Sequence, residues 1–149
     1  MIASILILVV SLAMFVYWFR YTSLLILSAK PVKDYGKQVA EANQLGFLEV
    51  QEQLILPSNR AALEKLEAAL SRDYKLLTSL LKHTPGFSES DGAFEHTMLR
   101  IDYRLMQLWY SAVRHVSESR ARAALREMAD IVAHFASSMG QVCAVRAEN

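Results

Sequence analysis

The sequence predicts an all-α protein: a single N-terminal transmembrane helix followed by an antiparallel helical bundle, with four helices as the simplest arrangement and three as the alternative. Residues 2–19 contain no charged side chain, and most of the later sequence repeats apolar residues at spacings of three and four. Clear turn-forming residues gather at 57–59 and 84–92. We therefore divide the chain into 1–30, a transmembrane anchor with a juxtamembrane helix, and 31–149, a cytoplasmic helical bundle.

The first element is the membrane anchor. The uncharged run Ile2–Phe19 has 18 residues, and as a helix it would reach roughly 27 Å, close to the hydrocarbon thickness of about 30 Å. The end of this run is rich in residues that favour the membrane–water boundary. These predicted membrane-interface residues are Tyr17, Trp18, Arg20 and Tyr21. The apolar pattern continues through Leu24–Leu27, and Pro31 should end the helix.

Two other interpretations of this segment are less well supported. A cleaved signal peptide needs a basic start and small residues at its cleavage site, whereas here no charge precedes the run and bulky side chains follow it. A buried core helix would not explain why aromatic and basic residues gather at one end. Basic residues then indicate the orientation: Arg20, Lys30, Lys33 and Lys37 follow the span, against one acid, Asp34. The positive-inside rule predicts a cell-membrane protein with its N-terminus outside and its C-terminal domain in the cytoplasm.

The composition of the remaining chain excludes some classes of partner. Residues 38–149 hold 12 of the 16 basic and 14 of the 15 acidic side chains. A nucleic-acid-binding protein needs a basic face, so we expect no nucleic-acid partner. The single cysteine, Cys143, rules out an intrachain disulfide framework and is expected to be a small buried thiol.

The next two elements are helices separated by a short turn. The first is expected from about Asp34 to Leu56, with Gly46 as a weak point. Pro57-Ser58-Asn59 forms the turn, and the second helix covers about Asn59 to His83, with leucines and Tyr74 on one face. The segment Thr84–Gly92 is the one clear loop.

The last two patterns are the most regular in the chain, and each predicts a helix with a coiled-coil-like seam. The third helix has Phe94, Met98, Ile101, Leu105, Leu108, Ala112 and His115 at these spacings, and the fourth has Ala121, Leu125, Met128, Val132, Phe135, Met139 and Val142. Both seams lose phase at Ser117–Ser119, where a serine would cap a new helix. One long helix over residues 93–145 is the alternative. Short connections favour antiparallel neighbours.

Motifs for chemistry are absent from the sequence. It has no phosphate-binding glycine loop, nucleophile elbow or zinc-protease motif, no paired Glu-x-x-His for a di-iron site and no covalent haem motif. We therefore predict no catalytic, cofactor-binding or metal residues and no cofactor. Three histidines were considered as possible metal or haem ligands. His96 and His134 lie opposite the predicted seams and should be solvated. His83 and His96 would lie near the same end of the bundle, so they form the one pair to test as a ligand site.

The function predicted from these features is that of a structural or adaptor protein, not an enzyme. Its bundle would assemble, stabilise or regulate a membrane complex, and its partners would be the bilayer and other membrane-protein subunits or a second copy. A membrane-tethered sensor that binds a small apolar ligand or haem is the alternative. The third helix carries more apolar surface than one seam requires. The partner-docking residues predicted on this second face are Leu99, Met106, Trp109 and Val113. The alternative is that this face packs inside the bundle against a row of small residues on the fourth helix, namely Ala129, Ala133, Ala136, Gly140 and Cys143.

Overall fold

The computed structural model confirms the all-α class. It describes residues 1–29, 35–56, 59–84 and 93–147, and within these ranges every regular element is a helix. The six helices are α1 (Ile2–Ser28), α2 (Gly36–Asn43), α3 (Phe47–Gln53), α4 (Arg60–His83), α5 (Ala93–Val113) and α6 (Glu118–Ala147). The chain divides into two compact units, Met1–Lys30 and Pro31–Asn149.

Helix α1 forms the first unit. It has 27 residues and therefore extends past the uncharged run, through the leucines that follow Arg20, to Ser28. Among the described residues it is the one helix long and apolar enough to cross a membrane, judged by length and composition. Ala29 takes an extended conformation and ends it. Lys30, Pro31 and Lys33 of the predicted stop and charge cluster lie outside the described residues, whereas Lys37 is exposed in α2.

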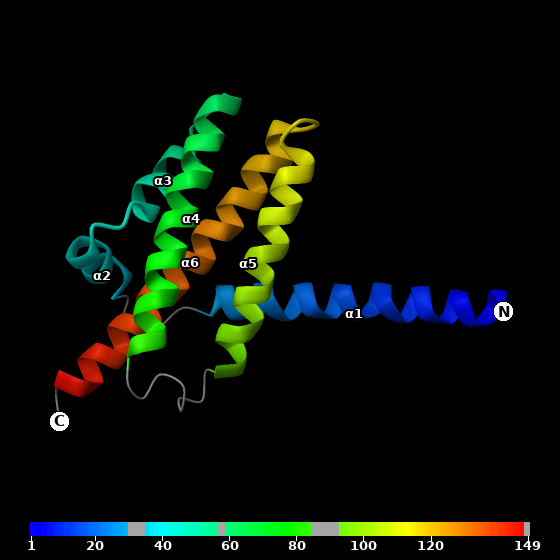
Figure 1. Cartoon of the computed structure of the whole chain (residues 1–149), viewed down its shortest axis with the longest axis horizontal. Helices are drawn as coiled ribbons and strands as arrows, with labels where there is room; N and C mark the ends of the chain where they lie inside the picture. Colours follow the sequence, from blue (N-terminus) through cyan, green and yellow to red (C-terminus); the bar gives the residue numbers. More distant parts are fainter. Residues whose placement is uncertain (30–34, 57–58, 85–92, 148–149) are drawn as a thin grey trace. The chain divides into compact units, whose positions relative to one another are not determined.

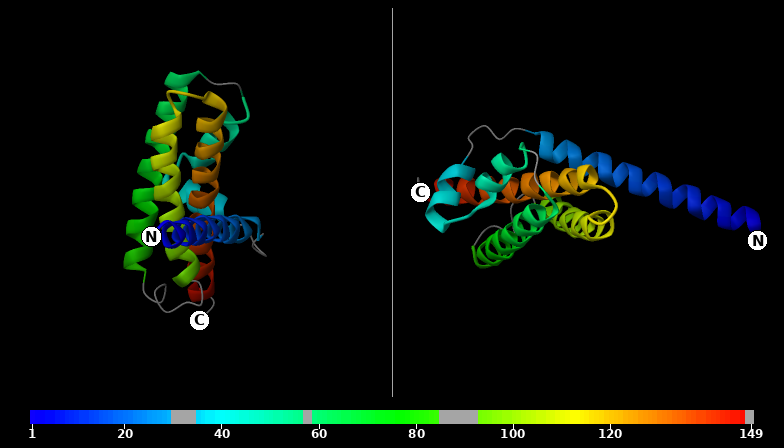
Figure 2. Two further views of the ribbon diagram at one scale, coloured as in Figure 1. Left: turned by 90° about the vertical axis from the view of Figure 1, so that its right-hand side faces the viewer. Right: turned by 90° about the horizontal axis from the view of Figure 1, so that it is seen from above.

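The second unit is built on three long antiparallel helices (Figures 1 and 2). Helices α4, α5 and α6 alternate in direction, and residues 114–117 make the reversal between α5 and α6. The chain therefore has two helices over 93–145, and the single long helix is excluded. Helix α6 is central because α2, α3, α4 and α5 all pack against it.

The predicted first bundle helix is present as two short helices. Gln44 adopts a left-handed conformation with φ 53° directly after α2, and α3 starts after Gly46. The Gly46 amide donates a 2.7 Å hydrogen bond to the Asp73 carboxylate on α4. Because Asp73 is buried, this bond fixes the α2–α3 corner on the long helices. The two short helices take the place that a fourth long helix would have filled. Pro57 and Ser58 of the predicted turn lie outside the described residues.

Local sequence signals explain where the long helices begin and end. The Asn59 side chain accepts a 3.0 Å hydrogen bond from the Ala62 amide and caps α4. At the other end, Lys82 and His83 lie in the last turn, where positive charge opposes the helix dipole. Most of the predicted loop 84–92 lies outside the described residues.

Stacked and tilted aromatic rings join the three long helices. Tyr74 on α4 and Tyr103 on α5 stack with their ring centroids 3.8 Å apart, and Phe135 on α6 lies 6.1 Å from Tyr74. The core also contains aliphatic side chains that are almost completely buried. They include Leu63, Leu70, Leu77, Leu99, Leu125, Met128 and Val132.

Helix α6 buries most of its predicted seam, but the seam predicted for α5 is wrong. Of its seven residues Met98 alone is buried, whereas Ile101, Leu105 and Leu108 are exposed. The buried side of α5 instead contains His96, Leu99, Asp102, Tyr103, Tyr110 and Val113. Large aromatic rings replace leucines as the main core groups on this helix, which explains why a seam of aliphatic residues did not identify the buried face.

Candidate functional site

An apolar stripe on the outer side of α5 is the most unusual surface feature of the bundle. Leu108 has 68% of its surface exposed, Trp109 48%, and Leu105 42%. Large apolar side chains on a folded domain are ordinarily exposed singly, so a continuous row indicates a contact surface. We call this row the outer stripe. Its members are Phe94, Ile101, Leu105, Leu108, Trp109 and Ala112.

The outer stripe lies on the side of α5 that faces away from α4. Tyr103 stacks on α4, Gln107 donates a 3.1 Å hydrogen bond to Glu67, and Arg114 lies 3.7 Å from Glu64. At about 100° per residue, the outer stripe is centred roughly 180° around the helix from these three residues. The contacts with α4 therefore turn the stripe outward.

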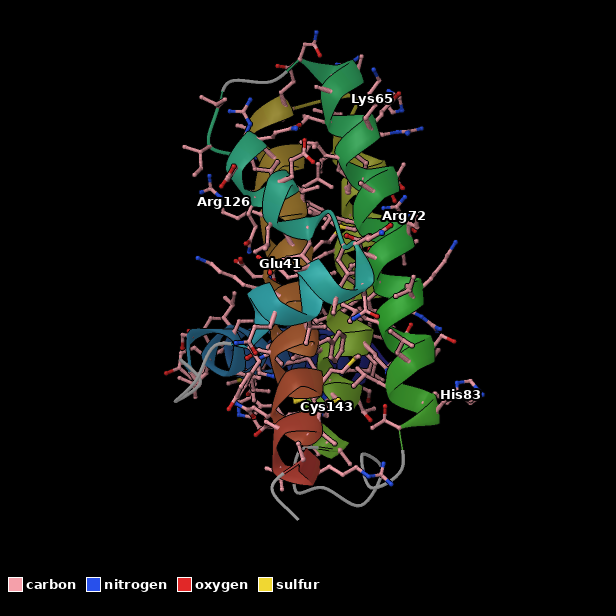
Figure 3. All side chains as sticks on the ribbon, turned by 90° about the vertical axis from the view of Figure 1, so that its left-hand side faces the viewer. Glu41, Lys65, Arg72, His83, Arg126 and Cys143 are labelled. Carbon is pink, nitrogen blue, oxygen red and sulfur yellow. The ribbon has the colours of Figure 1, made fainter. Side chains whose placement is uncertain are left out.

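The exposed side of α4 has the opposite character. Figure 3 shows Lys65, Arg72 and His83 along the outer side of α4, pointing away from the other helices. Charged residues on an outer face are the usual arrangement for a bundle in water. The contrast between α4 and α5 makes the outer stripe a specific feature of one helix.

The predicted docking residues are only partly on this surface. Leu99 and Val113 are buried in the bundle, so they are not available to a partner as predicted, and Met106 is half-buried. Trp109 is half-exposed and lies at the edge of the outer stripe. The sequence therefore identified extra apolar surface on this helix, but the predicted seam is the exposed face. Leu99 and Val113 of the second face are buried in the bundle, in agreement with the alternative of internal packing.

Two arginines follow one edge of the outer stripe. Arg104 lies three residues after Ile101 and four before Leu108, so it is next to both on the helix surface. Arg100 lies one turn before Arg104, and both side chains are exposed. The acid on the exposed surface of α5 is Glu95, in the first turn. The long edge of the outer stripe that faces α4 therefore carries positive charge.

A pair of histidines lies at the α5–α6 contact, which differs from the prediction that both are solvated. His96 is 8% exposed, with its ring centroid 5.6 Å from Phe135 and 6.2 Å from His134. Burial, the nearby His134 and Arg100 together lower the pKa of His96 to about 4. Burial also lowers the pKa of His134, although Glu95 opposes this change. Both rings are therefore neutral near pH 7.

The residues considered for metal or thiol chemistry do not form a site. His83 is exposed, and its Nδ1 lies 2.7 Å from the Ser79 carbonyl oxygen. His96 is paired with His134 instead of His83. In the part of the chain that the structure describes, no three metal-ligating side chains come together. Cys143 is exposed, contrary to the predicted burial.

The predicted membrane-interface residues all lie on α1. Tyr17, Trp18 and Tyr21 are exposed, and Arg20 is partly exposed. The spacing of Tyr17 and Trp18 from Tyr21 is four and three residues, so the three rings share one side of the helix. This arrangement agrees with the aromatic belt that membrane-spanning helices carry at the membrane–water interface.

Comparison of the chain with protein-family models, curated proteins and solved structures finds no match.

Proposed function

We propose that the protein is a membrane-anchored structural or adaptor protein, in which α1 spans the bilayer and the bundle assembles, stabilises or regulates a membrane complex. The observation that carries this proposal is the combination of a 27-residue apolar helix with a separate bundle that has its own core. An exposed apolar helix of this length needs a hydrocarbon environment to bury its side chains. The bundle supplies the surface on which other chains can assemble.

The proposed orientation places the bundle in the cytoplasm beneath the cell membrane. Arg20 and Lys37 follow the apolar run together with Lys30 and Lys33, and cytoplasmic flanks of membrane spans are enriched in basic residues. A tag at Asn149 is then expected to resist protease added to intact cells. Changing Lys30, Lys33 and Lys37 to Glu should weaken this preference, with Arg20 left as a partial signal.

Membrane insertion is tested by extraction of membranes with alkaline carbonate. The full chain should stay in the membrane pellet, as integral proteins do. Two leucines of the apolar run changed to arginine, Leu6→Arg and Leu12→Arg, should release it, because each charge at the centre of a span costs about 3 kcal/mol on insertion scales. Release of the unchanged chain would contradict the anchor.

Assembly is tested by purification of the tagged full chain in a mild non-ionic detergent. A membrane protein that co-purifies in constant ratio supports the adaptor function. A coloured or mass-detectable small molecule in the purified bundle would favour the sensor alternative instead. A chain that elutes alone, with no second copy, would contradict a role in assembly.

A further inference from the structure

The outer stripe resembles the membrane-binding face of an interfacial helix more closely than it resembles an ordinary solvent-exposed face. Such helices carry Trp, Phe and Leu on one side and basic residues beside them. Here Phe94, Leu108 and Trp109 are exposed together, with Arg104 at the edge. A tryptophan at the border of an apolar face is favoured at the level of lipid headgroups.

A short segment of chain connects α1 to the bundle that carries the outer stripe. The segment from Ala29 to Tyr35 covers six residue steps and extends at most roughly 20 Å. The start of the bundle is therefore confined near the end of α1. A surface that is tethered in this way needs little affinity of its own, because its second contact is intramolecular.

The bundle is entered at the end where the outer stripe begins. A Cβ placed on Gly140 of α6 would lie 3.2 Å from Val39 Cγ2 and closer still to Tyr35 Cβ, so the first residues of the bundle rest on this part of α6. Gly140 follows His134, which contacts His96, and α5 runs antiparallel to α6. The start of α5, with Phe94, is thus at the entry end, and the outer stripe runs away from it along the bundle.

We propose that the outer stripe lies in the headgroup region of the bilayer that holds α1, with Arg100 and Arg104 next to anionic lipid headgroups. This inference rests on the membrane anchoring proposed above. It adds a second contact with the membrane, through which the bundle lies along the bilayer with α5 facing it. The charged outer side of α4 is then left for water and for protein partners.

The test uses the fluorescence of Trp109 in the full chain. The sequence has two tryptophans, so Trp18→Phe leaves Trp109 as the single reporter. The protein is reconstituted into phosphatidylcholine vesicles with and without phosphatidylserine, and a matched set contains acyl chains brominated near the headgroup. We expect Trp109 emission to shift to shorter wavelength and to be quenched by the brominated lipid, while acrylamide in the buffer quenches it weakly.

A pair of matched substitutions separates the stripe from apolar surface in general. Leu105→Asp with Leu108→Asp should abolish quenching by brominated lipid. Leu76→Asp on α4 is the control, because Leu76 is exposed to a similar degree at 39%. It should leave the quenching unchanged. Circular dichroism of each variant in the same vesicles checks that the bundle remains folded.

The arginines are tested separately, with variants that keep the stripe apolar. Arg100→Gln and Arg104→Gln should each weaken the contact by roughly fivefold in vesicles containing phosphatidylserine, from the usual contribution of one basic residue near an anionic surface. They should have little effect in phosphatidylcholine alone. Equal weakening of the contact in vesicles with and without phosphatidylserine would contradict the proposed position of these arginines next to anionic headgroups.

Two results would overturn the inference while leaving the anchor intact. If the protein resists carbonate extraction but acrylamide alone quenches Trp109, the outer stripe faces water. If neither quencher reaches Trp109 and the chain cross-links to a second copy or to another protein, a protein covers the stripe. Release of the protein by carbonate would instead overturn the proposed function itself.

Discussion

Acidification should destabilise the bundle through the buried His96 and the half-buried His134 beside it. Both rings have a lowered pKa, so the fold favours their neutral forms. The unfolded chain binds protons on these rings below its ordinary pKa of about 6.5, whereas the folded chain does not until the pH is lower. Their contribution is therefore fully present above about pH 6.5 and is lost as the pH falls toward 4.

The magnitude for His96 follows from its pKa. A change from 6.5 to about 4 corresponds to about 3 kcal/mol, at 1.36 kcal/mol per pKa unit. Little screening by water is expected because His96 is 8% exposed. His134 adds to the effect in the same direction. Against a typical total stability of 5 to 15 kcal/mol, a loss of this size is a large fraction.

The assay is guanidinium unfolding of the full chain in a non-ionic detergent, followed by circular dichroism between pH 4 and 7. His96→Gln removes one titrating ring and should flatten the fall in unfolding free energy over this range. His83→Gln is the control because that ring is exposed at the end of α4. Carboxylates that titrate in the same range contribute equally to the pH dependence of the wild type and of each variant, so their contribution cancels when the proteins are compared. Equal pH dependence in the wild type and His96→Gln would refute the reasoning.

Four further substitutions test the packing of the bundle by the same unfolding measurement. Asp73→Ala should cost about 1.5–3 kcal/mol because it removes a buried carboxylate that accepts a hydrogen bond from Gly46; an unchanged midpoint would show that the α2–α3 corner is held by apolar packing. Gly140→Ala should cost about 1–3 kcal/mol, since its methyl group overlaps Tyr35; a neutral result would mean that α2 moves aside freely. Phe135→Asp should unfold the bundle, whereas Leu105→Asp should change stability by about 0.5 kcal/mol or less, because Phe135 is buried and Leu105 is exposed; equal effects would contradict the faces assigned here.

The sequence was sufficient for the elements that depend on local signals. The apolar run predicted α1, and Asn59 and the periodic leucines predicted α4 closely. Gly46 was recognised as a weak point, although the full break also depends on Gln44, whose left-handed conformation has no strong sequence signal. These elements are governed by hydrophobic pattern, capping and turn residues that lie close together in the chain.

The orientation of α5 could not be obtained in the same way because both of its sides are apolar. A periodic pattern shows that a helix has apolar faces, but the neighbouring helices decide which one is buried. Here Tyr103 stacks on Tyr74, and this contact turns Leu105 outward. The one acid in the middle of this helix, Asp102, is completely buried. Tyrosines on the same side as Asp102 were the available signal for the correct face.

The close approach of Tyr35 to Gly140 also determines how mechanical force would enter the bundle. Tension transmitted along the chain from α1 reaches α2 first, and α2 packs on α6. Because α3, α4 and α5 also pack on α6, the contact between α2 and α6 connects the entering chain to the element that holds the whole bundle together. If α1 is anchored in a bilayer as proposed, a moving membrane would act on this contact before any other contact of the bundle.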